Sequence, residues 1–177
     1  LLGYGTEISG TARIMVFGVN SGTGRADLHI RFGESVSEAL SDLGEKNSCC
    51  DHANRDEMIN VGFLSANETN ETGFRFIYLE LTGEDVSVSL KAVQAVFIFQ
   101  DLEYRGSFEC SDPLVNKIWQ TAAYTAHLNM QEYLWDGIKR DRLVWIGDMQ
   151  TEVMTIASVF GYNDIVPRSM DLVRDET

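Results

Sequence analysis

The chain has 177 residues, of which 44% are hydrophobic, and this is enough for one or two globular units with buried cores. Its 14 Lys and Arg residues stand against 27 Asp and Glu residues, which gives a formal net charge of -13. Such an acidic chain lacks the basic face that binds nucleic-acid phosphates and the basic cluster that holds a protein on anionic lipid. No apolar run approaches the roughly 20 residues that span a bilayer. We therefore expect neither nucleic acid nor a membrane as a partner.

Residues 1–106 have the composition and spacing of β-structure. Apolar residues recur at every second position in residues 12–16, 28–32 and 86–90, and residues 74–81 are rich in aromatic and β-branched side chains. Short runs of period two, separated by segments rich in Gly, Asn and Ser, are typical of antiparallel sheets. We expect an antiparallel β-sandwich over this part of the chain.

The polar stretch of residues 44–60 has no period, and we interpret it as a long loop. It contains Cys49 and Cys50, and Cys110 is the third cysteine. An odd cysteine count with two adjacent members is not a disulfide framework, and without a Cys-x-x-Cys pair a zinc site is not expected. The sequence therefore predicts neither a metal site nor a cofactor.

Helical patterns replace the β patterns after residue 106. Asp112 followed by Pro113 is a helix start, and apolar residues then recur every four positions, which predicts a helix over about 113–131. A second apolar stripe, at spacings of four, three and four residues, predicts another helix that ends at Gly161. A third, shorter helix is expected to start near Asp164, with Pro167 in its first turn.

The chemistry-bearing segment lies between the first two predicted helices, at residues 135–148. These fourteen residues contain three carboxylates, three cations and two indoles. Hydrolysis of a glycosidic bond needs one carboxyl group to protonate the leaving oxygen and a second to activate water or attack the sugar. Neighbouring like charges help to keep such an acid protonated, and indole faces suit the apolar face of a sugar ring. The segment therefore favours a carbohydrate-active site, although mixed charge on a solvated face and a helix cap at Asp148 would also explain it.

Two blocks of the sequence closely resemble the α-L-rhamnosidase family of glycoside hydrolases. Residues 106–119, GSFECSDPLVNKIW, resemble the family's junction between a β-sandwich and the catalytic (α/α)6 barrel. Residues 136–148, DGIKRDRLVWIGD, resemble the family's active-site loop of three acidic residues. FGES at 32–35 and GFRF at 73–76 are similar to the family's sandwich.

The resemblance implies an inverting hydrolase that removes terminal α-L-rhamnose from glycosides or polysaccharides. Carried over by position, it implies a general acid, Asp141, and these substrate-binding residues: Asp136, Asp148, Trp145, Arg140 and Arg142. Among these, the two aspartates would hold rhamnose hydroxyls, the indole would wall the sugar pocket and the arginines would orient the carboxylates. The well-known motif has glutamate at the position of Asp141, and aspartate has a reach about 1 Å shorter, a displacement that can cost about a hundredfold in rate.

The resemblance also implies that the sequence is a piece of a larger enzyme. A barrel of six helical hairpins needs many more helices than residues 107–177 can form, and no residue here matches the family's general base, a glutamate later in the barrel. We expect residues 1–106 to be a β-sandwich accessory domain and residues 107–177 to be the start of a truncated (α/α)6 catalytic domain, inactive by itself. Helix faces without barrel neighbours are expected to pack differently or to form a homodimer.

Two alternative functions stay open at this point. The chain would also fit a carbohydrate-binding module with a structural helical tail, or another (α/α)6 carbohydrate-active enzyme such as a polysaccharide lyase. A lyase is expected to use Tyr or His near the cleaved bond, whereas this loop offers carboxylates. The sequence leaves the compartment open.

Overall fold

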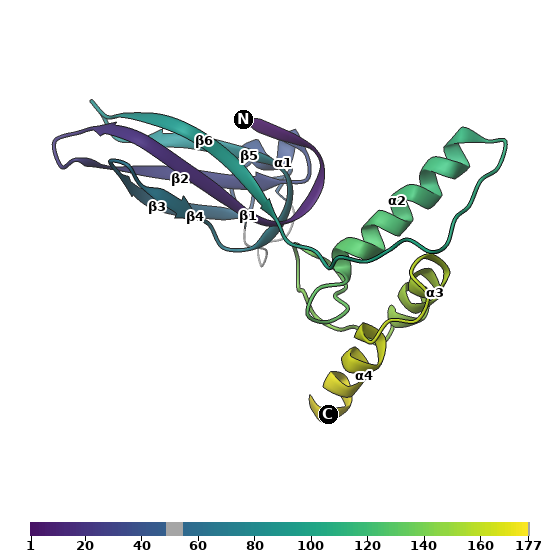
Figure 1. Cartoon of the computed structure of the whole chain (residues 1–177). Helices are drawn as coiled ribbons and strands as arrows, with labels where there is room; N and C mark the ends of the chain where they lie inside the picture. Colours follow the sequence, from purple (N-terminus) through teal and green to yellow (C-terminus); the bar gives the residue numbers. More distant parts are fainter. Residues whose placement is uncertain (49–54, 177) are drawn as a thin grey trace. The chain divides into compact units, whose positions relative to one another are not determined.

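The computed structural model describes residues 1–48 and 55–176. They form two compact units, Leu1–Ile98 and Phe99–Thr177, the first built from strands and the second from helices (Figure 1). An antiparallel β unit followed by a helical unit is therefore confirmed. The units separate at Ile98, whereas the predicted domain boundary lies at residue 106, which stays a prediction.

The first unit is one antiparallel sheet that curls over its core, in place of the two facing sheets of the predicted sandwich. Its strands run in the order β3-β2-β5-β1-β4, and β6 also pairs with β1. The elements of this unit are β1 (Leu2–Asn20), β2 (Arg25–Gly33), α1 (Val36–Leu40), β3 (Asp56–Gly62), β4 (Ala66–Glu68), β5 (Thr72–Thr82) and β6 (Ser87–Phe97).

The curl follows from the length and irregularity of β1. This strand pairs with β5 over its first half and with β6 over its second half, and its register shifts between Gly3 and Ile8. Gly10 lies where the partners change, and a Cβ atom added there would lie 1.9 Å from the carbonyl oxygen of Val96. Only glycine permits the two backbones to approach so closely. A long strand with such irregularities bends and lets a single sheet enclose a core.

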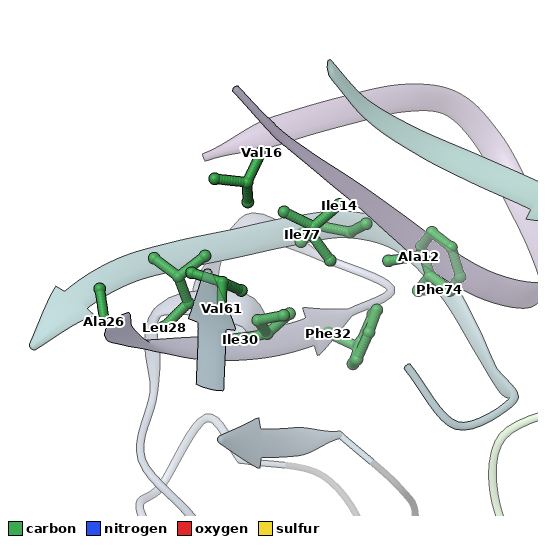
Figure 2. Close-up of a cluster of buried hydrophobic side chains, with 10 residues drawn as sticks. All are labelled: Ala12, Ile14, Val16, Ala26, Leu28, Ile30, Phe32, Val61, Phe74 and Ile77. Atoms are coloured by element: carbon green, nitrogen blue, oxygen red, sulfur yellow. The ribbon is translucent and has the colours of Figure 1, made fainter. Parts of the chain in front are cut away.

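The core of the β unit includes the residues that the period-two pattern predicts in β1 and β2, together with residues that this pattern did not predict. The alternating side chains of β1 and β2 point to the same interior, where β5 and β3 add further apolar groups (Figure 2). All ten members are at most 4% exposed: Ala12, Ile14, Val16, Ala26, Leu28, Ile30, Phe32, Val61, Phe74 and Ile77. On the opposite face of these strands Phe17 is 61% exposed, whereas Arg31 is only 8% exposed.

The loop predicted over residues 44–60 is wrong at its end, because β3 begins at Asp56. This strand pairs with β2 in continuous register from Arg25↔Gly62 to Arg31↔Asp56. It lies at one end of the strand order, where polar side chains on an exposed edge hide the strand pattern from sequence analysis. The middle of the predicted loop, including Cys49, Cys50 and His52, lies outside the described residues.

The second unit contains the three predicted helices, α2 (Pro113–Asn129), α3 (Met149–Val159) and α4 (Ile165–Glu176). The side chain of Asp112 caps α2 by accepting a hydrogen bond from the Leu114 backbone N–H at 2.8 Å, as predicted. Gly161 follows α3 with a φ of 78° and donates its N–H to the carbonyl of Ile156, so the second predicted stop is confirmed. Among the helices that the structure describes, none is long and apolar enough to cross a bilayer.

The segment that leads into α2 packs on the helical unit, which explains why the units separate before residue 106. The backbone N–H groups of Arg105 and Gly106 donate to the carbonyl of Val159 at 2.8 and 2.9 Å. The ring of Tyr104 lies edge-on against Phe160, with centroids 4.9 Å apart. The extended segment therefore belongs structurally with the helices.

Candidate active site

The loop that resembles an active-site motif connects α2 to α3 and is anchored at both ends. At its start, Met130 and Leu134 form an isolated antiparallel bridge and are 0% and 1% exposed. The backbone N–H of Trp135 donates to the carbonyl of Asn129, the last residue of α2, at 3.0 Å. At its end, the buried Met149 begins α3. The polar segment between these anchors is therefore placed by apolar packing on either side.

Asp136 closes the loop upon itself. Its backbone N–H donates to the carbonyl of Leu143 at 2.9 Å, and its Oδ1 accepts the backbone N–H of Leu143 at 3.0 Å. The residue is half-buried. One carboxylate oxygen thus has a fixed partner, which orients the group without consuming its full acceptor capacity.

Asp141 lies at the tip of this loop in a backbone conformation that is uncommon for residues other than glycine. Its φ is 58°, and the φ of the following Arg142 is 54°. Aspartate tolerates this left-handed region better than most residues, and such conformations cluster at functional sites. The Nε of Arg140 lies 3.6 Å from Oδ1 of Asp141, whose side chain is 25% exposed. The predicted acid is therefore reachable from solvent and has a cation beside it.

Asp148 takes the N-cap position of α3, yet its side chain makes no capping hydrogen bond. The Asp112 side chain, by contrast, does cap α2. Asp148 is exposed at the start of the helix, where the partial positive charge of the helix end favours an anion. Capping therefore does not explain its side chain, and its role in binding substrate stays a prediction.

Trp145 and Arg142 line a small pocket of about 210 Å³ that opens between the loop and α4. The guanidinium of Arg142 lies over the ring of Trp135, 5.5 Å from its centroid. The complete lining is Tyr133, Trp135, Arg142, Leu143, Val144, Trp145, Leu172 and Val173. Within the helical unit as described, none of the three aspartates lines this pocket. The structure therefore groups the indoles with Arg142 and leaves the carboxylates on a different part of the loop surface.

Glu152, in the first turn of α3, is influenced electrostatically by two of the aspartates, and the sequence analysis did not identify it. Partial burial and the negative charges of Asp148 and Asp136 raise the pKa of the Glu152 carboxyl to about 7. Both predicted substrate-binding aspartates therefore act electrostatically on this one group. An acidic residue in the first turn of a helix is common, so no sequence pattern distinguishes Glu152 from other such residues.

The sequence around this loop is similar to known glycoside hydrolases. Residues 103–177 match the family model described as the bacterial α-L-rhamnosidase 6 hairpin glycosidase domain. A curated α-L-rhamnosidase of Formosa agariphila is 33% identical over 76 residues, which are 43% of this chain and 8% of that protein. The part of the chain that contains the helical unit is thus similar to six-hairpin glycosidase domains.

Solved structures agree over nearly the whole chain. A rhamnosidase from Klebsiella oxytoca with rhamnose bound has a TM-score of 0.83 at 20% identity, and the match covers 96% of this chain and 34% of that one. A GH78 family rhamnosidase of Bacillus sp. GL1 has a TM-score of 0.68 at 21% identity, covering 99% of this chain and 18% of that one. These likenesses show the fold. The chain spans about a third or less of the relatives that it matches.

The resemblance predicted from the two sequence blocks is therefore confirmed. The chain is similar to α-L-rhamnosidases, and the residues that match the family model include the whole loop with its three aspartates.

Proposed function

We propose that this chain forms the β accessory unit and the first catalytic-domain helices of an inverting α-L-rhamnosidase, which removes terminal α-L-rhamnose from glycosides or polysaccharides. The observation that supports this most directly is the placement of Asp136, Asp141 and Asp148 on one anchored loop before α3, inside the residues that match the family model.

In this proposal Asp141 protonates the glycosidic oxygen as the bond to the anomeric carbon breaks, while a water attacks from the opposite face. Arg140, 3.6 Å from the carboxyl, holds the group in position. Asp136 and Asp148 accept hydrogen bonds from sugar hydroxyls, with the Asp136–Leu143 hydrogen bonds keeping the first of them oriented. Trp145, which is 50% exposed, offers an apolar face to the ring, and the proposed role of Arg142 is to orient the carboxylates.

The general base is proposed to lie outside these residues. Inversion needs two carboxyl groups about 6.5–9.5 Å apart across the sugar, with room for a water between them. The chain covers 34% of the Klebsiella relative's length. No residue of this chain corresponds to the glutamate that serves the family as general base later in the barrel. We therefore propose that these 177 residues alone do not turn over a rhamnoside.

The experiment is to monitor rhamnose release by proton NMR in the longer enzyme that the proposal requires. β-L-Rhamnose should be the first anomer released from an α-L-rhamnoside, because inversion changes the configuration. Asp141→Asn should lower kcat by about 10²–10⁴-fold, the usual contribution of a general acid. Release of the α anomer first, or an unchanged kcat in the variant, would contradict the proposal.

A second copy of this chain is the partner that we propose for the exposed apolar face of α2. Leu114 and Ile118 lie one turn apart on this helix and are 63% and 57% exposed. Contiguous apolar surface of this kind commonly marks an interaction site. A homodimer would cover it when the chain is studied by itself.

A further inference from the structure

The buried hydroxyl of Ser169 connects α4 to the start of the candidate loop. Ser169 is 0% exposed, and its Oγ accepts the backbone N–H of Leu134 at 2.9 Å. The same hydroxyl donates its proton to the carbonyl of Ile165, one turn earlier in α4, at 2.7 Å. The hydroxyl therefore has one partner in its own helix and one in the loop, and its oxygen is oriented as an acceptor for the loop.

The backbone N–H of Leu134 depends on this acceptor. Leu134 forms an isolated antiparallel bridge with Met130. The hydrogen bonds of this bridge come from the neighbouring N–H groups of Gln131 and Trp135, at 3.1 and 3.0 Å. In a pair of this type the two opposed residues exchange no hydrogen bond with each other. Because Leu134 is only 1% exposed, water does not replace Ser169, and a buried N–H group without an acceptor would be destabilising.

Other residues of α4 face the loop from the same side of the helix. The guanidinium of Arg168 lies 5.9 Å from the centroid of the Tyr133 ring. Leu172, one turn after Arg168, lines the pocket of about 210 Å³ together with Trp135 and Trp145. Residues four apart lie on the same face of a helix. This face of α4 is therefore directed at the residues on either side of Leu134.

The contact with Ser169 lies close to the first aspartate of the loop. Only Trp135 separates Leu134 from Asp136, whose N–H and carboxylate are both bonded to Leu143. The backbone is thus held in α4 just before Asp136 and across the loop at Asp136 itself. A displacement of the loop start would move the Asp136 carboxylate with it.

We infer that Ser169 is a positioning residue of the candidate active site, which acts through Leu134 to fix Asp136 for binding a sugar hydroxyl. This inference rests on the proposed function, since it takes Asp136 as a residue that binds rhamnose. A binding group that moves by about 1 Å can cost about a hundredfold in rate, so a single buried hydrogen bond at the loop start matters for the site.

The first test uses this chain and needs no turnover. Ser169→Ala removes the acceptor, so the Leu134 amide should exchange with deuterium about tenfold faster, and the Asp136 amide signal should shift, in NMR spectra of 15N-labelled protein. Ser158→Ala is the matched control, because the exposed Ser158 hydroxyl makes the same bond within its own helix, to the carbonyl of Met154 at 2.7 Å. Unchanged exchange of Leu134 in Ser169→Ala, or an equal increase in Ser158→Ala, would overturn the inference.

The second test separates positioning from a merely structural role in the longer rhamnosidase. Ser169→Thr keeps the hydroxyl, whereas Ser169→Val has nearly the same shape without it, so their difference isolates the hydrogen bond from the added volume. The inhibition constant of free L-rhamnose should be about fivefold higher for Ser169→Val than for Ser169→Thr, at a temperature where both are folded. A structural role would change the fraction of folded enzyme, and hence kcat, but not this constant. Equal inhibition constants would overturn the inference.

The two tests also distinguish the possible failures. A longer wild-type protein that releases no rhamnose would reject the proposed function, even if the exchange experiment confirms the hydrogen bond between Ser169 and Leu134. An active wild-type enzyme in which Ser169→Thr and Ser169→Val bind rhamnose equally well would reject only the inference on Ser169.

Discussion

Asp136 and Leu143 hold the two sides of the candidate loop together through a pair of hydrogen bonds. The Asp136 N–H reaches the Leu143 carbonyl at 2.9 Å, and the Leu143 N–H reaches the Asp136 carboxylate at 3.0 Å. The residue proposed to bind a sugar hydroxyl therefore also shapes the loop that presents Asp141. The two roles of Asp136 can be separated experimentally. The hydrogen bond to Leu143 needs only an acceptor oxygen, whereas the proposed binding of a sugar hydroxyl benefits from the negative charge.

Asp136→Asn should keep the loop and weaken the site. The amide oxygen can still accept the Leu143 N–H, so the free energy of unfolding should change by less than about 0.5 kcal/mol. Asp136→Ala removes the acceptor and should lower the free energy of unfolding by about 1 kcal/mol. Urea unfolding followed by circular dichroism measures both. Equal destabilisation by the two variants would show that the hydrogen bond does not support the loop.

Gly106→Ala should destabilise the helical unit. A Cβ atom at this position would lie 1.8 Å from the carbonyl oxygen of Ser158, so the chain must move away from the end of α3. Overpacking of this kind typically costs about 1–3 kcal/mol. Gly147→Ala is the matched control, because nothing lies within 4 Å of its added Cβ. The helical signal at 222 nm should melt at a lower temperature only in the Gly106 variant, and equal melting of both variants would contradict the packing.

Glu152→Gln should change how stability depends on pH. The folded protein binds the Glu152 proton more tightly than the unfolded chain, because the pKa rises from 4.5 to about 7 on folding. The resulting stabilisation is fully present below about pH 4.5 and is lost as the pH rises through about 7. Because the glutamine of Glu152→Gln cannot ionise, the variant does not lose stability in this way. The Tm of the variant minus the Tm of wild type should therefore increase from about pH 4.5 to about pH 7.

The expected size of this change is modest because Glu152 is only partly buried. Solvent screening reduces the effect to roughly 1 kcal/mol, or about 2–4 °C in Tm for a chain of this length. Thermal unfolding at about pH 4.5 and pH 8 provides the measurement. A Tm difference between variant and wild type that stays constant across this range would show that the group titrates normally.

The strands and helices could be predicted where burial imposes a period. Alternation in β1 and β2 and the four-residue spacing in α2 follow directly from which faces are buried. The edge strand β3 could not be recognised, since one of its edges and much of its surface meet solvent. The single curled sheet depends on a register shift in β1 and on the contact between Gly10 and Val96, which no periodic pattern encodes.

The sequence motif predicts which residues belong to the candidate site but not how they are arranged in space. The sequence pointed to all three aspartates because they share one loop with indoles and cations. It did not reveal that Trp145 lines a pocket apart from them, or that Glu152 is coupled to Asp148 and Asp136. Such relationships depend on loop conformation and on helix packing, which are tertiary properties.

Replacing Leu114 and Ile118 together by lysine should make the isolated chain more monomeric. Both side chains are more than half exposed on α2, and two lysines would place positive charges on a face that the proposed homodimer buries. Sedimentation velocity should show a dimer for wild type and a monomer for the double variant. Phe17→Lys, which changes a 61% exposed residue of the β unit, should leave the dimer intact. A wild-type monomer at all concentrations would reject the interface.

The most direct test of the central claim, that Asp141 is the general acid, compares two leaving groups in the longer rhamnosidase. A 4-nitrophenyl leaving group departs without much protonation, whereas an alkyl alcohol or a sugar needs the acid. Asp141→Asn should therefore reduce kcat/KM for an alkyl or glycosyl α-L-rhamnoside by about 10²–10⁴-fold and for the 4-nitrophenyl compound much less. An equal loss for both substrates would contradict the assignment of Asp141 as the proton donor.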